Sequence, residues 1–491
     1  MEKMHAGSIL AKPEVRSLVN EVVATLRHVL PPSGFADRER AALEIGNELV
    51  RCALEDDLRE LSAGYGDDVR VDGVLYRRHE DATVTYHGLV GPMAISRATY
   101  RKVGVRNGPT VVPLELETGL VEHATPALAL SIAHGYALHD MRQHLELFAA
   151  AQRNPPSRTT LERIARRTSS TAVASQARIE RALRRAEAPP AGAVAIAIGL
   201  DRTSTAMVES RAANAPPKAT TRRKPLKRRP PAPFDVNWRM AYVGTVSFVD
   251  ENGEAIRTIR YASPACDDPT ALVDSMTADC RAALRRTPTL GVGIVQDGAP
   301  EMWNRTREGL AKLKEEGGIG SWEEGIDRYH LMERLAEALA LIEPAPEVRR
   351  RTLDEWKERF DSRDSTIDSI ETFLLKAYPR LTESGAQTKL WEHLGYIRRN
   401  KDRMRYVTLR LAHLPVGSGV TESAAKTVIA LRAKRSGQRW REPALRGVLT
   451  LRAVHQSGRF QAFWRHLGRR QLHPPIDVNY ISPSCSSLTR G

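Results

Sequence analysis

Three carboxylates in this sequence have types and positions that suit the binding of divalent cations. Asp201 closes the apolar run VAIAIGLD and Asp297 closes GVGIVQDG, so each is expected at the end of a buried strand, where open α/β sheets place their sites. An isolated buried carboxylate is energetically expensive, which favours a charged partner there. The alternative is that each aspartate only caps the following turn, as an Asp before Gly298 would.

Glu422 is the third carboxylate, in the first turns of a helix expected after Gly417-Ser418-Gly419, with Ser418 as the N-cap. Taken alone, it would be a surface ion pair with Lys426, worth roughly a few tenths of a kcal/mol. Together the three carboxylates supply the hard oxygen ligands that Mg²⁺ or Mn²⁺ prefers. Two such ions can activate an attacking water or 3′-hydroxyl and stabilise the leaving oxygen at phosphorus.

The elements expected to position these carboxylates lie in a first catalytic segment over residues 189–343. Its pattern predicts the order β-β-β-α-β-α-β-α, a mixed α/β layout with an antiparallel start and a parallel end. Two of the strands meet at a hairpin turn at Asn252-Gly253. Helices are expected over 269–286 and 301–315, and a short strand near 325–329.

The rest of the C-terminal half is predicted to be helical. Residues 344–410 are polar and contain no strand-like run, which indicates an all-helical insertion. Residues 411–470 are expected to form the last helices of the catalytic domain and to carry Glu422, and 471–491 form a tail.

The N-terminal part predicts two further regions. Residues 1–125 are expected to hold two helices over about 13–64 and a small antiparallel meander over 69–103. Residues 126–188 resemble a helix-turn-helix, in which Ser157 caps the second helix. That helix presents groups that suit phosphates and base edges, and the alternative is a plain helical hairpin with arginines on its solvated face. The predicted DNA contacts are Arg158, Thr160 and Arg163.

The net charge of +15, from 74 basic and 59 acidic residues, favours a polyanionic partner, with nucleic acid first. A protein whose charge only keeps it soluble is the alternative. The segment with the most biased composition, 216–233, is rich in proline and cannot pack a core. We therefore expect a flexible basic loop that contacts DNA, or else a solvated linker. Its predicted contacts are Arg222, Arg223, Lys224, Lys227, Arg228 and Arg229.

A second basic segment surrounds and follows Glu422. Phosphate contacts are expected from Lys426, Arg432, Lys434, Arg435 and Arg439. Trp440 suits stacking on an unpaired base, but a core position is favoured for it.

Composition sets the broad class. The chain has 491 residues, of which 41% are hydrophobic and 27% charged, as in a globular protein of several packed units. No apolar run is long enough to span a membrane, and the N-terminus has no secretory signal pattern, so a cytoplasmic protein is expected. The four cysteines lie far apart, which predicts neither disulfides nor structural zinc.

Several ordered motifs resemble the DDE transposases of Kra-type bacterial insertion sequences. The C-terminal stretch contains Asn-x-x-x-Met-Arg-Tyr, a Gly-x-Val-x-Glu helix, Arg-Ser-Gly-x-x-Trp and a closing Phe-Trp, over about 65 residues. VQDGAPEMW, IDRYHLMERL and GLDRTSTAMV continue the similarity, which covers the chain from about residue 82 onward. Two departures are the sequence DRTST after Asp201 and the lack of cysteines in TYRKVGVRNG.

The resemblance implies a ribonuclease H-like catalytic domain, with Asp201, Asp297 and Glu422 as ligands of two Mg²⁺ or Mn²⁺ ions. It also implies that Asp327 and His330, an acidic-x-x-His element, orient a phosphate or a water; the alternative is that Asp327 caps a helix and His330 packs.

The function expected from these features is cleavage and strand transfer at the ends of the protein's own insertion sequence. The partners would be the element ends and target DNA, with a homo-oligomer in the DNA complex and a location at the bacterial nucleoid. Two alternatives remain open: a decayed or domesticated copy that binds DNA without cutting it, and a metal-dependent nuclease without strand transfer.

Overall fold

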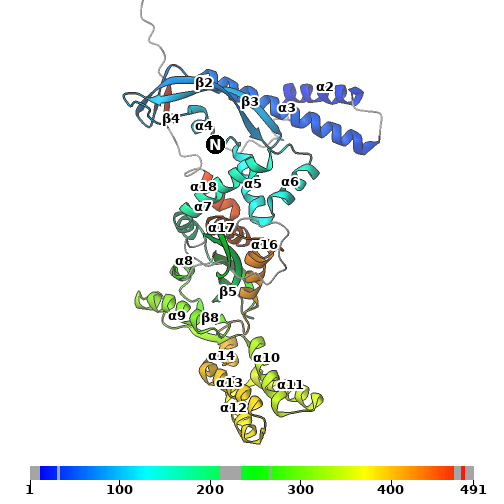
Figure 1. Cartoon of the computed structure of the whole chain (residues 1–491), viewed down its shortest axis with the longest axis vertical. Helices are drawn as coiled ribbons and strands as arrows, with labels where there is room; N and C mark the ends of the chain where they lie inside the picture. The colour runs from blue at the N-terminus through cyan, green and yellow to red at the C-terminus, as the bar shows by residue number, and fades with distance from the viewer. Residues whose placement is uncertain (1–11, 30–33, 211–233, 265–267, 469–476, 481–491) are drawn as a thin grey trace, which may run out of the picture. The chain divides into compact units, whose positions relative to one another are not determined.

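The computed structural model describes residues 12–29, 34–210, 234–264, 268–468 and 477–480, and the chain divides into two compact units (Figure 1). Unit 1 comprises Met1–Thr168 and Gly468–Gly491, and unit 2 comprises Ser169–Leu467. Among the described residues, no helix has the length and apolar character needed to cross a membrane. The predicted basic loop over 216–233 lies outside the described residues, and so do all six of its expected DNA contacts.

Unit 1 is built on an antiparallel sheet with the strand order β10-β1-β2-β3-β4. The strands are β1 (Asp68–Val71), β2 (Val74–Gly88), β3 (Gly91–Lys102), β4 (Thr110–Val111) and β10 (Val478–Tyr480). The meander expected over 69–103 is therefore confirmed. The sequence did not predict the fifth strand, which comes from the C-terminal tail and pairs with β1.

Helices complete unit 1, and the two expected over about 13–64 are present as α2 (Pro13–Val29) and α3 (Phe35–Ala63). Leu58 of α3 packs in a core with Tyr86, Met93 and Ile95 of the meander. The remaining helices are α4 (Pro113–Thr118), α5 (Pro126–Leu138), α6 (Met141–Ala150) and α7 (Arg158–Ala186), and α7 contributes residues to both units.

The sheet of unit 2 has the order β7-β6-β5-β8-β9. Its strands are β5 (Ala195–Ser210), β6 (Phe234–Val249), β7 (Ala255–Ser263), β8 (Gly291–Gln296) and β9 (Glu323–Ile326). The pairs β5-β6 and β6-β7 are antiparallel, whereas β5-β8 and β8-β9 are parallel. With α8 (Thr270–Arg286), α9 (Pro300–Glu315) and α10 (Arg328–Ile342), this confirms the expected order of elements and the mixed sheet.

Two details of the expected strands are wrong. β5 does not end at Asp201 but continues to Ser210, because its outer half still pairs with β6, where Asp201 faces Val243. The strand expected near 325–329 ends at Ile326, and Asp327 instead caps α10.

Alternation along β5 separates two cores. Ile196, Ile198 and Leu200 pack with residues of α8 and α9, including Met276 and Trp303. The opposite face carries the small residues Ala195 and Ala197, which join a second core with α10 and the helical segment that follows. Small side chains on this face let helices approach the strand closely.

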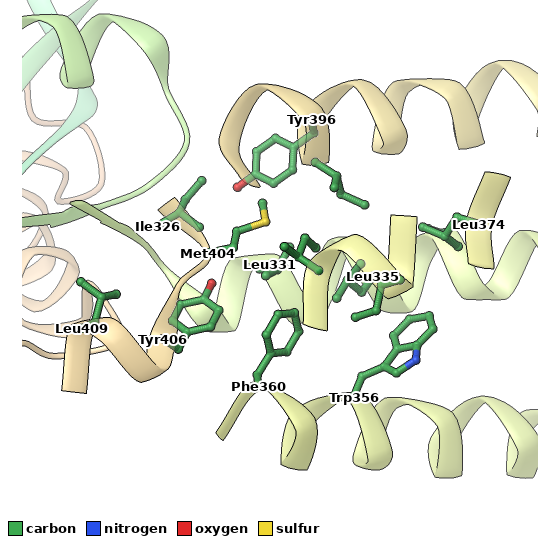
Figure 2. Packing of buried hydrophobic residues seen from close by; sticks show 14 of the residues in the cluster. Ile326, Leu331, Leu335, Trp356, Phe360, Leu374, Tyr396, Met404, Tyr406 and Leu409 are labelled. Atoms are coloured by element: carbon green, nitrogen blue, oxygen red, sulfur yellow. The ribbon is translucent and has the colours of Figure 1, made fainter. Parts of the chain in front are cut away.

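The residues expected to form an all-helical segment, 344–410, contain helices and no strand. The helices are α11 (Pro346–Ser362), α12 (Thr366–Ala377), η1 (Tyr378–Arg380), α13 (Ser384–Asn400), η2 (Lys401–Arg403) and α14 (Tyr406–Leu411). Figure 2 shows their core, in which Trp356, Phe360 and Leu374 pack with Leu331 and Leu335 of α10. The rings of Phe360 and Tyr406 meet edge to face at 5.4 Å.

The last helices of unit 2 begin with a continuous stretch made of α15 (Gly419–Ala424), the π-helical turn η3 (Ala425–Ala430) and α16 (Leu431–Ala433). α17 (Glu442–Gln456) and α18 (Phe460–Leu467) follow. The π turn begins at Ala425, directly after the short helix α15 that carries Glu422, and such turns are frequent at functional sites.

Candidate active site

Asp201 and Asp297 lie just beyond the point where the parallel pairing of β5 with β8 ends. The last pair of residues in that parallel ladder is Ile198 with Ile294. Asp201 and Asp297 each lie three residues beyond the last paired residue of their strand. Beyond the ladder, the side chain of Gln296 replaces the backbone pairing: it accepts from Leu200 N–H at 3.1 Å and donates to Thr306 Oγ1 at 3.2 Å. Gln296 is 1% exposed, and it holds the two strands together where they part.

Asp201 is partly buried. Burial raises its pKa, and the negative charges of Asp297 and Glu422 raise it further, whereas the backbone N–H of Arg202 and the nearby His330 act to lower it. The Arg202 N–H donates to Oδ1 at 2.7 Å. The influence of Asp297, Glu422 and His330 shows that these groups lie close enough to Asp201 to affect its charge.

Asp297 is exposed and begins the loop between β8 and α9. Its Oδ1 accepts from the N–H of Gly298, and its carbonyl accepts from Trp303 Nε1 at 2.8 Å. A Cβ at Gly298 would come within 2.7 Å of the Tyr396 ring on α13, so only glycine allows this approach. The turn-capping role considered for Asp297 is present, because its carboxylate accepts from the N–H of Gly298 in the turn that follows.

Glu422 reaches the site because α15 packs unusually close to the sheet. A Cβ at Gly199 of β5 would lie 2.0 Å from Thr421 Oγ1, and that hydroxyl hydrogen-bonds with Thr245 of β6 at 2.7 Å. Glu422 follows Thr421 in the first turn of α15. Glu422 contacts Ser418 and His330. The surface ion pair with Lys426 that was considered from the sequence is not formed among the described residues.

Ser418 precedes α15 as expected, but its side chain makes no N-cap hydrogen bond. Its hydroxyl lies 2.8 Å from Glu422 Oε1 and 2.9 Å from Asp327 Oδ2, so its single proton can serve one carboxylate at a time. Ser418 is 5% exposed. The capping expectation was wrong because two carboxylates, that of the buried Asp327 and that of the partly exposed Glu422, compete for the hydroxyl.

Asp327, which is buried, and His330, which is partly exposed, form a pair next to Glu422. Asp327 Oδ1 accepts from the His330 N–H at 2.8 Å, and Oδ2 accepts from the backbone and hydroxyl of Ser418. Although burial acts to raise the pKa of Asp327, these hydrogen bonds hold it below its usual value. His330 Nδ1 lies 3.1 Å from Asp327 Oδ1 and 3.7 Å from Glu422 Oε1. Burial opposes protonation of His330, but Asp297, Asp327 and Glu422 raise its pKa overall.

Among the described residues, the one group of three possible ligands within 4.8 Å of one another is Asp327, His330 and Glu422. Asp201 and Asp297 lie outside it. Asp327 is a poor ligand because both of its oxygens already accept hydrogen bonds. Asp201 and Asp297 each use one oxygen to accept a single backbone N–H, and their second oxygens have no hydrogen-bond partner among the described residues. Carboxylate oxygens that accept no hydrogen bond are available to a hard divalent cation.

The predicted DNA contacts on α7 belong to unit 1. Arg158 Nε pairs with Glu162 at 2.9 Å, and Thr160 N–H donates to Ser157 Oγ at 3.4 Å, as expected for the N-cap. Arg163 is about half exposed and lies 3.5 Å from Glu122.

The predicted basic residues after Glu422 differ in their surroundings. Lys426, Lys434 and Arg439 are exposed, Arg435 is partly exposed, and Lys434 Nζ lies 2.5 Å from Thr203 Oγ1 on β5. Arg432 departs from expectation: it is 3% exposed and stacks on Trp440, so it does not present its guanidinium to a phosphate. Trp440 is buried and donates to the Ala433 carbonyl at 3.1 Å, which confirms the core position.

Sequence reasoning missed the roles of Gln296, Ser418, Thr421 and Tyr396. Gln296 carried a signal, because a polar residue inside the apolar run GVGIVQ needs a buried partner. The other three act through residues far away in the chain. No model of a known protein family matches this chain, and no curated protein shows significant similarity to it.

Proposed function

We propose that this protein is a DDE-type DNA transposase that cleaves the ends of its insertion sequence and joins them to target DNA. The observation that carries the proposal is the convergence of Asp201, Asp297 and Glu422, from three separate elements, on one sheet edge, where Asp297 and Glu422 act to raise the pKa of both Asp201 and His330. A ribonuclease H-like domain is part of the proposal, and the three antiparallel strands followed by two parallel strands support it.

In the proposed reaction, a water oxygen forms a bond to phosphorus and the bond to the 3′-oxygen breaks, which leaves a 3′-hydroxyl and a 5′-phosphate. That 3′-hydroxyl then attacks a phosphodiester of target DNA, and the bond to the displaced 3′-oxygen breaks. Two divalent cations, when bound, would lower the barrier by activating the nucleophile and stabilising the leaving oxygen. Asp201, Asp297 and Glu422 would hold them, because their carboxylates neutralise dications and leave positions for phosphate oxygens.

The surrounding residues orient this carboxylate set. Ser418 and His330 contact Glu422 Oε1, and Asp327 holds both of them in place. His330, whose pKa is raised by the neighbouring carboxylates, carries a proton more readily than an isolated histidine. It is thus suited to balance negative charge beside the reacting phosphate.

The test is cleavage of DNA that carries the inverted repeats flanking the gene, with Mg²⁺ or Mn²⁺. Asp201→Asn, Asp297→Asn and Glu422→Gln should each reduce cleavage to background while leaving binding to end DNA intact, since residues that act as a unit are each nearly as harmful to lose as all three. Asp354→Asn and Glu355→Gln, the same changes on the exposed face of α11, should leave cleavage unchanged. Mn²⁺ should raise the melting temperature of the wild type but not of the triad variants.

Three results would contradict the proposal in different ways. Cleavage by Glu422→Gln would show that the third ligand is misassigned, with Asp327 the next candidate. Cleavage without joined products would identify a nuclease. Binding to end DNA without any cleavage by the wild type would identify a DNA-binding protein that has no catalytic activity.

A further inference from the structure

A second feature of unit 2 is a groove of about 840 Å³ bordered by α7, β7, α8 and the start of α17. All of its lining residues belong to unit 2. Seven arginines line it, against two acids, Glu180 and Asp274. The arginines are Arg181, Arg184, Arg185, Arg281, Arg285, Arg286 and Arg446.

Internal ion pairs account for only part of this charge. Arg184 pairs with Glu180 and Asp279, whereas Arg281 pairs with Glu316 and Arg446 with Glu442. Of the two acids in the groove, Asp274 lies 3.7 Å from Lys312, so it too has a cation of its own.

Four arginines of the groove are exposed and have no carboxylate partner among the residues that the structure describes: Arg181, Arg185, Arg285 and Arg286. In addition, Arg281 Nε is buried and makes no hydrogen bond to any described residue. Within the described part of the chain, Arg181 and Arg286 donate only to backbone carbonyl groups, which carry no net charge. Guanidinium groups without carboxylate partners, gathered on facing helices, leave a concentrated positive field that favours an anionic ligand.

We infer that this groove binds the phosphate backbone of duplex DNA. Arginine suits phosphate because its planar group donates two parallel hydrogen bonds. Single-stranded DNA is bound largely by base stacking on exposed aromatic side chains. The one aromatic residue of the lining, Tyr261, is 4% exposed and its hydroxyl is bonded to Asp279. The lining also contains none of the exposed large hydrophobic side chains of the described residues, so backbone contacts are what it can offer.

The groove is separate from the carboxylate site. Its helix α8 packs on the face of the sheet that carries Ile196, Ile198 and Leu200, and Met276 of α8 lies against Gly244 of β6. By alternation along β5, Gly199 and Asp201 belong to the other face, where Thr421 packs. Figure 1 shows α8 and α16 on opposite sides of β5. The groove would therefore hold a stretch of DNA other than the one being cut.

The experiment measures affinity of the full chain for a random-sequence duplex in EDTA, over roughly 50 to 300 mM salt. The groove variant is Arg181→Gln, Arg185→Gln and Arg285→Gln together. The control variant, Arg351→Gln, Lys357→Gln and Lys389→Gln, removes the same charge from exposed positions of α11 and α13. Each phosphate contact contributes about −0.9 to the slope of log K against log salt, so the groove variant should have a slope shallower by about 2 to 3, and the control should match the wild type.

Because EDTA removes divalent cations, the result does not depend on the proposed cleavage activity: loss of cleavage in other tests would leave it intact. Equal slopes for the wild type and the groove variant would overturn the inference, provided melting temperatures show both proteins folded. Equal effects of both variants would show a response to net charge only. A loss confined to single-stranded DNA, or to poly-L-glutamate used as a second probe, would assign the groove to a different partner.

Discussion

Ser418 is not an expected metal ligand, but it connects two carboxylates of the candidate site. Its hydroxyl contacts both Glu422 and Asp327, and its backbone N–H also donates to Asp327. A ligand whose orientation is fixed by hydrogen bonds loses less entropy on binding a cation than one that rotates freely. Ser418 therefore links Asp327, and through it His330, to the carboxylate that would bind metal.

Ser418→Ala should lower cleavage roughly 10- to 100-fold, as loss of such a supporting contact does at metal sites, and should leave DNA binding unchanged. The measurement is the single-turnover cleavage rate across Mn²⁺ concentrations, in which a weaker metal affinity appears as a shifted midpoint. Ser423→Ala, an exposed serine in the same helix, is the control. Wild-type metal dependence in the Ser418 variant would remove it from the site.

His144 in unit 1 predicts a pH dependence of stability. The ring is 7% exposed, stacks edge to face on Phe148, and has no hydrogen-bond partner among the described residues for either nitrogen. Burial, followed by the positive charges of His139 and His134, lowers its pKa from 6.5 to about 4. As pH falls, the unfolded chain binds the proton first, so stability present above pH 6.5 is lost progressively between pH 6.5 and about 4.

His144→Gln should flatten that dependence by about 2 to 3 kcal/mol over the same interval, because the amide does not titrate. The measurement is the free energy of unfolding by urea at several pH values. His79→Gln, at an exposed histidine of β2, should keep the wild-type dependence. If the His144 variant is as acid-sensitive as the wild type, the loss of stability arises elsewhere, for instance at His134, whose pKa is also lowered.

At the scale of elements, the approach of α15 to β5 decides where Glu422 lies. Gly199→Ala would place a methyl group 2.0 Å from Thr421 Oγ1, so the helix must shift. We expect a loss of roughly 1 to 3 kcal/mol in stability, typical of overpacking, and a larger relative loss of cleavage. Adding Thr421→Ala should restore part of both, since it removes the clashing oxygen.

Gly385→Ala is the matched control, because nothing lies within 4 Å of a Cβ at that position. Thermal melts and cleavage rates of the four proteins separate the two effects. Wild-type behaviour of Gly199→Ala would mean that α15 does not pack as tightly on the strand as described.

The N-terminal part of α7 carries Arg163, one of the residues expected to contact DNA. Arg163 is half exposed, and its carboxylate neighbour Glu122 is 3.5 Å away, so its side chain remains accessible at the surface. If it contacts a base edge, Arg163→Ala should reduce the preference for end DNA over random DNA, because base contacts specify and phosphate contacts only position. Competition binding measures this, with Arg142→Ala on the exposed side of α6 as the control. Equal losses on both DNAs would indicate a phosphate contact only.

At the scale of the whole molecule, each unit has its own hydrophobic core. The two cores flanking the β5 sheet use buried residues between 195 and 414, with Ala193 and Val416 packed against them. The core of the meander uses buried residues between 58 and 120, with Val478 packed against it. Units with separate cores fold separately as a rule. The second half of α7 belongs to unit 2, where Ala172, Ile179 and Leu183 are buried.

A fragment over Ser169–Leu467 should therefore unfold cooperatively by circular dichroism, and the full chain should contain a matching transition. A fragment that begins at residue 189 should be clearly less stable, because it lacks the buried residues of α7. A broad, non-cooperative melt of the longer fragment would show that unit 2 needs unit 1 to fold.

The sequence by itself determined the elements and their order. Apolar runs and helical spacing predicted the five strands of the sheet in unit 2 and the helices between them in the right order, because both patterns are local properties of the chain, although β5 continues past its expected end at Asp201 to Ser210. It also indicated Asp201, Asp297 and Glu422, since strand ends and a Gly-Ser-Gly turn are visible in short windows. The core position of Trp440 was predicted correctly as well.

Only the tertiary structure decided how these parts meet. The continuation of β5 beyond Asp201 depends on pairing with β6, and the burial of Arg432 depends on stacking over Trp440. The contact of Ser418 with Asp327 joins residues 91 positions apart. Such contacts form only when whole faces of distant elements pack together. The lack of a side chain at Gly199 leaves room for Thr421, and its lack at Gly298 leaves room for Tyr396. A local pattern specifies which face of an element is apolar, but close packing between distant elements determines which partner that face receives.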